Sequence, residues 1–272
     1  MSDLKSRLDE LFWYHTIDVA PGITTKGMFD NRHALSIIPF PDLRGKRCLD
    51  VGTCDGLYAF HMEQRGAAEV VAVDLSDLTD LDYPPEVRHQ LAYDPSRSHL
   101  GPSRPGFDLL HEVLGSRVKW RGCNVYDLNR DDLGVFDVVV VGSLLLHLRD
   151  PVRALNAVRG VVGGQLIVAD YVHTPLMVRS RRRPLFELRG EGPDFQWWVG
   201  NDRGNRQLLQ VSGFNIEKVS RYFVLRFGPE LDKEYVPKLG LRETVNAVIN
   251  GALTGDRRRG HLHRAYRCRP RF

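Results

Sequence analysis

The residues with the clearest chemical meaning form a glycine turn, Gly52 to Gly56 in the segment LDVGTCDG, directly after a short apolar run. Because glycine lacks a β-carbon, the backbone amides of such a turn can approach a ligand closely, and the helix that begins next offers free N–H groups to a carboxylate or phosphate. Asp74 ends a second apolar run, VVAVD. It lies about 20 residues beyond the glycines, where a carboxylate can accept both hydroxyls of a ribose. The spacing therefore predicts a nucleoside-binding site.

The turn does not fit a dinucleotide. That fingerprint is GxGxxG, and Cys54 and Leu57 occupy the second and third glycine positions here, which leaves no room for a pyrophosphate. S-adenosylmethionine fits better, with its methionine carboxylate on the turn and its adenosine on Asp74, and DVGTCDG resembles motif I of class I methyltransferases. The alternative is a structural glycine turn in some other parallel sheet.

Residues beside the turn and after the third predicted strand extend this cofactor site. We assign Asp50 and Thr53 to it, although Asp50 could also simply hold backbone amides of the loop. Val125 and Tyr126 directly follow the third strand, and open α/β sheets bind ligands at the carboxyl ends of their strands. The position predicts a wall for adenine, with closure of the core by Tyr126 as the alternative.

Two histidines are candidate proton acceptors. His147 lies just past the fourth predicted strand, beside the expected methyl group, where an imidazole can take a proton from a hydroxyl or amine. The alternative is a histidine that only stabilises the turn before Asp150. His15 follows Trp13 and Tyr14 at the end of an amphipathic opening helix that we expect to cap the donor and exclude water, with Tyr14 facing the substrate. Packing of these rings against the sheet is the other interpretation.

Apolar runs that alternate with helical segments must position these residues, and such alternation is typical of a parallel sheet built from βαβ units. One helix has Asp150 as its cap and Pro151 in its first turn. Strands are expected at 48–51, 70–74, 118–120, 136–141, 165–169, within 214–227 and at 261–269, and helices after Gly56, after Asp150 and over 205–212. The pattern predicts a Rossmann-like α/β fold with a seven-stranded, mostly parallel sheet and a final antiparallel strand.

A single domain of this kind accounts for most of the 272 residues. Residues 1–43 are expected to form a helical cap, and residues 44–272 the cofactor-binding domain. Insertions at about 171–200 and 228–260 are placed to cover the ligand edge of the sheet, where loops decide the substrate.

The composition indicates which classes of binding partner and which cellular compartment are expected. The formal net charge of +4 permits an anionic partner without demanding nucleic acid, and no apolar run is long enough for a membrane span. The four cysteines are scattered without a CxxC pair, which indicates neither a disulfide framework nor a zinc site, so no metal is expected. The acid-containing start lacks a signal sequence, which predicts a cytoplasmic protein.

Two residues of the carboxyl-terminal half are expected to contact a substrate. Trp198, beside Trp197 in the first insertion, either lines a substrate pocket, stacks on a base or fills the core. Arg264 shares one face of the last strand with Leu262 and Tyr266 and is the only charge on that face, and a buried arginine requires an anionic partner. A carboxylate of the donor or substrate is the predicted partner.

A further set of segments covers nearly the whole chain in the order WYHTID, APGITTKG, LDVGTCDG, NVYDL, GSLLLHLRDP and WW. In them the chain resembles the bacterial tRNA wobble-uridine 5-oxyacetic acid methyltransferase family. The resemblance implies the class I methyltransferase fold, carboxy-S-adenosylmethionine as donor and tRNA as substrate, and it assigns Lys26, Gly142 and Arg264 to the donor site. Leu146 replaces the tyrosine of the family's LYH segment, and the tryptophan-containing stretch after KG is shorter. Both departures favour ordinary S-adenosylmethionine.

These observations predict a methyltransferase that uses S-adenosylmethionine and methylates a small-molecule acceptor by direct displacement. The first alternative is (carboxy)methylation of a tRNA wobble uridine. The second is a protein that binds the same ligand without methylating, either a lyase or cyclase or a regulatory subunit. The acceptor atom and the oligomeric state stay open.

Overall fold

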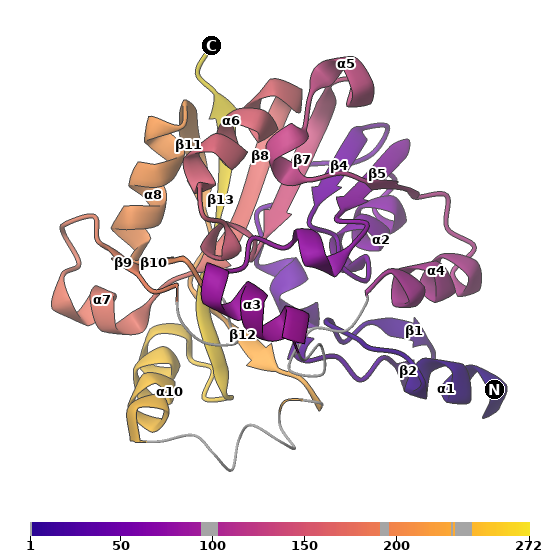
Figure 1. Ribbon diagram of the computed structural model, residues 1–272, viewed down its shortest axis with the longest axis horizontal. Coiled ribbons are helices and arrows are strands. Elements are labelled where there is room, and N and C mark those ends of the chain that lie inside the picture. Colours follow the sequence, from indigo (N-terminus) through magenta and orange to yellow (C-terminus); the bar gives the residue numbers. More distant parts are fainter. Residues whose placement is uncertain (1, 94–102, 191–195, 230, 232–240) are drawn as a thin grey trace.

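The centre of the molecule is a nine-stranded sheet in the order β3-β12-β13-β8-β7-β4-β5-β6, with β11 also paired to β13. The computed structural model describes residues 2–93, 103–190, 196–229, 231 and 241–272 (Figure 1). The strands are β3 (Phe29–Asp30), β4 (Arg47–Val51), β5 (Glu69–Asp74), β6 (Lys119–Gly122), β7 (Phe136–Gly142), β8 (Val162–Tyr171), β11 (Phe214–Val219), β12 (Phe223–Phe227) and β13 (Gly260–Pro270).

Strands β4 to β8 are parallel, and their order contains one reversal. The chain runs outward from β4 through β5 to β6, then returns to β7 on the other side of β4 and continues to β8. In α/β sheets a ligand binds in the crevice where the order reverses, which here is the carboxyl edge of β4 and β7. β13 is antiparallel to β8. This is the Rossmann-like class I methyltransferase fold that the sequence predicts.

The sheet has nine strands rather than the predicted seven, for two reasons. The segment 214–227 breaks at Ser220 into β11 and β12, which pair with opposite ends of β13. At the break the Ser220 hydroxyl accepts the amide of Ala265 at 2.9 Å, so that a side chain replaces a ladder bond. In addition, β3 from the cap pairs with β12 and forms the edge of the sheet.

Helices cover both faces of the sheet (Figure 1). The α-helices are α1 (Ser2–Asp9), α2 (Leu57–Gln64), α3 (Pro85–Tyr93), α4 (Arg104–Val113), α5 (Arg130–Leu133), α6 (Pro151–Val161), α7 (Thr174–Arg179), α8 (Asp202–Val211) and α10 (Leu241–Thr254). The 3-10 helices are η1 (Arg32–Ser36), η2 (Leu78–Asp80), η4 (Val125–Asp127) and η5 (Leu145–His147). As predicted, Asp150 caps α6, because its side chain accepts the Arg153 amide at 2.9 Å.

Two apolar layers follow from the alternation along the strands. Side chains such as Phe60 and Phe107 pack α2, α4 and the cap against one face, and side chains such as Leu155 and Leu209 pack α6 and α8 against the other. Helix α8 begins at Asp202, three residues before the predicted start. The reason is Asn201, whose side chain caps the helix by accepting the Gly204 amide at 2.8 Å.

The cap differs from the sequence prediction. Helix α1 ends at Asp9, so Trp13 to His15 lie beyond the helix in the chain that leads to a short hairpin of β1 (Asp18–Ala20) and β2 (Ile23–Thr24). The first predicted insertion contains α7 and a hairpin of β9 (Phe186–Leu188) and β10 (Trp198–Gly200), and the second contains α10. Within the described residues no helix has the length and apolarity needed to cross a membrane.

Candidate cofactor and acceptor sites

The glycine turn is held tightly between neighbouring strands. The amides of Gly52 and Thr53 both donate to the Val73 carbonyl, at 2.9 and 3.1 Å. Gly52 has a φ of 73°, and a β-carbon there would lie 3.3 Å from Leu144, which follows β7. Gly56 has a φ of 93° and precedes α2 as its cap residue. The left-handed conformations explain why glycine occupies both positions of the turn.

Asp50 lies buried beneath the turn. One of its carboxylate oxygens, Oδ2, accepts the Thr53 hydroxyl at 2.7 Å and the Ala59 amide at 3.1 Å. The other, Oδ1, is buried and has no hydrogen-bond partner in the described part of the chain. Burial raises the pKa of Asp50 to about 7. A buried oxygen of this kind fits the ammonium group of an amino acid ligand, since a cation would compensate the buried charge.

Asp74 ends β5 beside the turn, as predicted. Its carboxylate accepts the Cys54 amide at 2.6 Å and the Leu75 amide at 2.8 Å. Burial raises its pKa. Each carboxylate oxygen can accept more than one hydrogen bond, so these contacts orient Asp74 and leave capacity for the hydroxyls of a ribose.

Asp55 links the turn to the cap, and the sequence analysis did not single it out. The side chain is fully buried and accepts the backbone amides of Tyr14 at 2.9 Å and His15 at 2.7 Å. Its other oxygen pairs with Nδ1 of His15. An ionised Asp55 keeps the proton on Nδ1, which leaves the lone pair on Nε2. The acid inside DVGTCDG was the available signal, but its partner lies 40 residues earlier in the chain.

Two tyrosines complete this cluster above the carboxyl edge of β4 and β7. The Tyr58 ring covers Gly142, where a β-carbon would lie 2.4 Å from the ring. The His15 ring lies between the two phenols, with its centroid 4.8 Å from Tyr14 and 6.2 Å from Tyr58. Burial raises the pKa of both phenols, so they act as neutral hydrogen-bonding groups. The structure thus brings together the predicted Tyr14, His15 and Gly142.

Val125 and Tyr126 follow β6 in η4, as expected from their sequence position. The Tyr126 hydroxyl donates to Asp82 at 2.7 Å and accepts the Asp150 amide at 3.1 Å, while Val125 is buried in the apolar layer under α6. These contacts give Tyr126 a part in closing the core. A contact of either residue with adenine stays a prediction.

Two cations that are predicted to contact a ligand carboxylate have protein partners in the structure, and their contact with a ligand stays a prediction. Lys26 pairs with Asp9 at 2.7 Å, and both side chains are half exposed. Arg264 has the anionic partner that its position demands, but this partner is Asp202 of α8, at 3.2 Å. Its Nε also donates to the Ser220 carbonyl at 3.0 Å, at the break between β11 and β12. Lys26 and Arg264 therefore both have a protein carboxylate nearby, although Asp202 also pairs with Arg206 at 2.9 Å.

His147 and a second, unpredicted histidine lie near the end of β7. His147 is the last residue of η5, directly after that strand, and its role as a base stays a prediction. Ser143 has a φ of 50°, and its hydroxyl lies 3.0 Å from Nε2 of the buried His263. Nδ1 of His263 lies 3.0 Å from the His261 carbonyl and must donate to it, so Nε2 accepts the Ser143 hydroxyl. Burial lowers the pKa of His263 to about 3.

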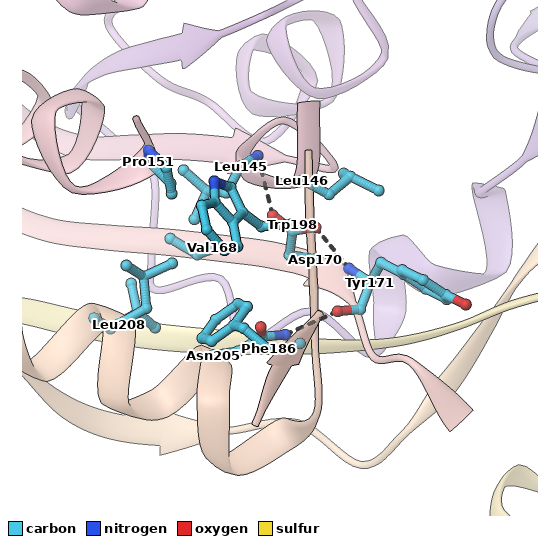
Figure 2. A pocket seen from close by; sticks show the side chains of 12 residues that line it. Leu145, Leu146, Pro151, Val168, Asp170, Tyr171, Phe186, Trp198, Asn205 and Leu208 are labelled. Carbon is cyan, nitrogen blue, oxygen red and sulfur yellow. Dashed lines mark hydrogen bonds between the residues drawn. The ribbon is translucent and has the colours of Figure 1, made fainter. Parts of the chain in front are cut away.

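Trp198 lines an apolar pocket beside this edge of the sheet. Figure 2 shows the pocket between η5, the end of β8, α8 and the β9–β10 hairpin. Its lining includes Leu145, Leu146, Pro151, Val168, Asp170, Tyr171, Phe186, Trp198, Gly200, Asn205, Leu208 and Leu209. The indole nitrogen of Trp198 donates to the Arg149 carbonyl at 3.0 Å, which fixes the ring against the segment after η5.

Comparison with known proteins agrees with this architecture. Residues 49–168 match the family model described as a methyltransferase domain. The chain is 30% identical over 133 residues to the tRNA U34 carboxymethyltransferase of Campylobacter hominis, and 29% identical over 121 residues to the ubiquinone biosynthesis O-methyltransferase of Neisseria meningitidis serogroup C. The matches cover 48% and 44% of this chain but only 38% and 41% of those relatives.

A solved structure with a similar arrangement is the 1,6-didemethyltoxoflavin-N1-methyltransferase of Burkholderia thailandensis with bound 1,6-didemethyltoxoflavin and S-adenosylhomocysteine. Its TM-score is 0.48 at 14% identity, over 84% of this chain and 72% of that chain. Residues 49–168 of the present chain therefore match a methyltransferase domain, and they contain the parallel strands β4 to β7 and most of β8.

Proposed function

We propose that the protein transfers a methyl group from S-adenosylmethionine to a small-molecule acceptor. The observation that carries this proposal is the joint placement of Asp50, the glycine turn and Asp74 at the carboxyl edge of β4 and β5, with Tyr14 and His15 hydrogen-bonded to the turn through Asp55. Asp50 fits the ammonium group of the donor, the turn fits its carboxylate, and Asp74 fits its ribose.

The charges around this site favour the ordinary donor over carboxy-S-adenosylmethionine. Asp50 and Asp55 are buried there, and Asp74 ends the neighbouring strand. The two cations that the resemblance assigns to a donor carboxylate, Lys26 and Arg264, are paired with protein carboxylates. An additional carboxylate on the transferred group would have to compete with Asp9 and Asp202 for these cations, whereas a cationic donor matches the acidic surroundings.

Methyl transfer in this site depends on positioning and on proton removal. When bound, S-adenosylmethionine supplies an electrophilic methyl group on a positively charged sulfur. Tyr14 and Tyr58 exclude water above Gly142, which keeps an acceptor aligned in a dry environment. His15 is the better supported base, because Asp55 fixes its Nδ1 and leaves Nε2 to take a proton. His147, at the end of η5, is the alternative base.

Donor binding is the first test. Isothermal titration with S-adenosylhomocysteine should show binding to the unchanged protein and a loss of at least about tenfold in affinity for Asp74→Ala. Asp108→Ala is the matched control, since this exposed acid pairs with Arg104 on α4. Equal affinities of Asp74→Ala and the unchanged protein would contradict the donor assignment.

The reaction is tested by mass spectrometry. The protein is incubated with S-adenosylmethionine carrying a deuterated methyl group and with fractionated small-molecule extracts. A product that gains the labelled methyl group supports the proposal, and once it is known, His15→Ala and His147→Ala identify the base by their turnover. S-adenosylhomocysteine binding without any transfer would favour a lyase, a cyclase or a regulatory binder.

Modification of a tRNA wobble uridine is the second candidate. It is supported by the 30% identity to a tRNA U34 carboxymethyltransferase. It requires a basic surface, because phosphate contacts supply most nonspecific affinity for nucleic acid. The formal net charge of only +4 argues against it. Salt-dependent binding of unmodified tRNA, together with transfer of the label to the tRNA, would establish this candidate instead.

A further inference from the structure

Exposed arginine side chains gather where the loop after α7 meets the start of α8 (Figure 1). This arginine cluster consists of Arg179, Arg181, Arg182, Arg183 and Arg203. The first of them ends α7, the next three lie in the loop that follows, and the last lies in the first turn of α8. All five side chains are exposed.

The loop is held against the start of α8 by contacts that leave the guanidinium groups out. The Asn201 side chain, which caps α8, donates to the carbonyls of Ser180 at 2.8 Å and Arg183 at 2.9 Å. It also accepts the Leu185 amide at 3.2 Å. Within the loop, the Arg183 amide donates to the Ser180 hydroxyl at 3.1 Å. These bonds involve only backbone groups of the arginines, so they place the charged side chains next to Arg203 without engaging them.

The cluster concentrates positive charge at one surface. No ion pair in the described part of the chain includes one of its five residues, although nearby Arg189 pairs with Glu187 at 3.2 Å and Arg206 with Asp202 at 2.9 Å. Residues 178–206 contain seven arginines and four acidic residues, a net charge of +3 in a chain whose total is +4. Such a concentration of one sign of charge creates a local potential that attracts an acidic partner.

Apolar side chains are exposed in the same segment. Val178 directly precedes Arg179 and is 62% exposed, and Phe186 and Leu188 of β9 are 39% and 57% exposed. Nucleic acid phosphates bind charged and polar groups and gain nothing from aliphatic side chains such as Val178 and Leu188. Protein interfaces, in contrast, combine arginine with aromatic and other apolar residues. This combination fits an acidic protein better than a nucleic acid.

We propose that the arginine cluster and the three exposed apolar side chains form a docking surface for a protein with an acidic, partly apolar face. A guanidinium group binds a carboxylate through two parallel hydrogen bonds, so arginines on an anchored loop can select a surface with matching carboxylates. Exposed ion pairs are individually weak and act mainly on association rate and specificity, while the apolar contacts add affinity. Binding at this surface does not depend on methyl transfer.

Two acidic peptides serve as probes for the docking surface. Both carry fluorescein and the same number of glutamates, and one has leucines where the other has serines. Their binding to the full chain is measured by fluorescence anisotropy. We expect the leucine peptide to bind with a Kd below about 100 μM and the serine peptide to bind at least about fivefold more weakly. Raising sodium chloride from about 50 to about 300 mM should weaken both, because salt screens exposed charges.

The chain offers a matched control, since it contains a second exposed run of three arginines at 257–259. Two variants reverse the same amount of charge at different places. They are Arg181→Glu/Arg182→Glu/Arg183→Glu and Arg257→Glu/Arg258→Glu/Arg259→Glu. The first should lower the affinity for the leucine peptide at least about tenfold, and the second less than about twofold. Thermal melting shows whether both variants fold.

Hydrogen exchange of the unchanged protein locates the peptide without any substitution. The leucine peptide should slow exchange at the amides of residues 178–188 and leave those of residues 256–260 unchanged. Exchange that is unaffected at 178–188 would overturn the proposal, as would failure of the leucine peptide to bind.

Three further outcomes would also overturn the proposal. Equal losses in the two folded variants would show that net charge alone attracts the peptide. Equal binding of the two peptides would show that the apolar side chains take no part. An unmodified tRNA transcript that binds more tightly than the leucine peptide, and loses affinity only in the variant at 181–183, would show that the surface binds nucleic acid.

Discussion

The turn proposed to bind the donor and the apolar pocket of Figure 2 are built in different ways. In the turn, most of the hydrogen bonds belong to the seven consecutive residues from Asp50 to Gly56. Asp74, at the end of the next strand, accepts the Cys54 amide of this turn. The pocket with Asp170 combines η5, β8, the β9–β10 hairpin and α8, which are spread over 65 residues from Leu145 to Leu209. A continuous turn specifies the proposed donor site, whereas tertiary packing alone assembles the apolar pocket.

The turn and the pocket also differ in what holds them together. Backbone amides of the turn and the carboxylates of Asp50, Asp55 and Asp74 form a connected hydrogen-bond network. Apolar contacts and single side-chain bonds, such as the one from Trp198 to the Arg149 carbonyl, hold the pocket. A buried network of charged groups responds strongly to the loss of one member, while an apolar pocket tolerates substitution of its lining.

The largest effect is expected for Asp55→Ala, which breaks the connection between the cap and the turn. The change leaves two backbone amides and the His15 ring without their shared acceptor, and each buried donor left without a partner costs about 1–3 kcal/mol. We expect a markedly lower melting temperature and a loss of S-adenosylhomocysteine binding. Hydrogen exchange should show faster exchange at the Tyr14 and His15 amides.

Asp55→Asn sharpens this test because it retains one carbonyl oxygen. It should keep part of the protection of the Tyr14 and His15 amides but disturb the pairing with Nδ1 of His15. The exposed Asp108→Asn is the control and should match the unchanged protein in all three measurements. Unchanged exchange at both amides in Asp55→Ala would show that the cap is held by packing rather than by this carboxylate.

The next largest effect is expected for Gly56→Ala at the end of the turn. A β-carbon there would lie 2.4 Å from Phe60 and 2.9 Å from Phe107, and the φ of 93° is unfavourable for alanine. Crowding in a packed core costs about 1–3 kcal/mol, and the left-handed conformation adds about 1 kcal/mol. The free energy of unfolding, measured with denaturant, should fall by about 2–4 kcal/mol.

Gly115→Ala separates the cost of crowding the β-carbon from the cost of the left-handed backbone conformation. Gly115 also has a positive φ, 59°, but a β-carbon there would meet nothing within 4 Å. This variant should therefore lose only about 1 kcal/mol, the cost of the backbone conformation. If Gly56→Ala and Gly115→Ala lose the same amount, crowding by the two phenylalanines contributes nothing and the turn is less tightly packed than its geometry indicates.

The contrast between the turn and the pocket also decides how much could be predicted from the sequence. The turn could be predicted from the positions of its glycines. The parallel strands could be predicted from the apolar runs, and Asp74 from its position at the end of the second run. Asp55 was missed because its role depends on an amide 40 residues earlier, and the partner of Arg264 was missed because α8 begins three residues before its predicted start.

A smaller effect concerns the pH dependence of donor binding. Burial raises the pKa of Asp50 to about 7, so the unliganded protein keeps this carboxyl protonated below neutral pH. Protonation of Asp50 stabilises the fold most at low pH. This contribution is lost as the pH rises from about 4, the pKa of the group in the unfolded chain, through about 7, its pKa in the folded protein. Without a ligand, the buried Asp50 prefers its protonated form. An ammonium group of the ligand reverses this preference, because it favours the ionised carboxylate.

Affinity for S-adenosylhomocysteine should therefore rise about tenfold between pH 6 and pH 8 and then level off. Titration calorimetry in buffers of different ionisation enthalpy should show proton release at pH 6. Asp50→Asn should abolish both the slope and the release, whereas Asp170→Asn should leave them in place although burial also raises the pKa of Asp170 to about 7. A flat affinity profile of the unchanged protein would remove Asp50 as the partner of the ammonium group.

The smallest effect is expected at Ser143, which directly follows β7. Its φ of 50° is unfavourable for any residue with a β-carbon, and its hydroxyl bond to His263 compensates for this cost. Ser143→Gly removes the bond but also the strain, each about 1 kcal/mol, so the melting temperature should hardly change. Ser143→Ala removes the bond and keeps the strain, and both variants leave Nε2 of the buried His263 without a donor. The alanine variant should therefore be about 1 kcal/mol less stable than the glycine variant, and equal stabilities would show that the φ of 50° costs nothing.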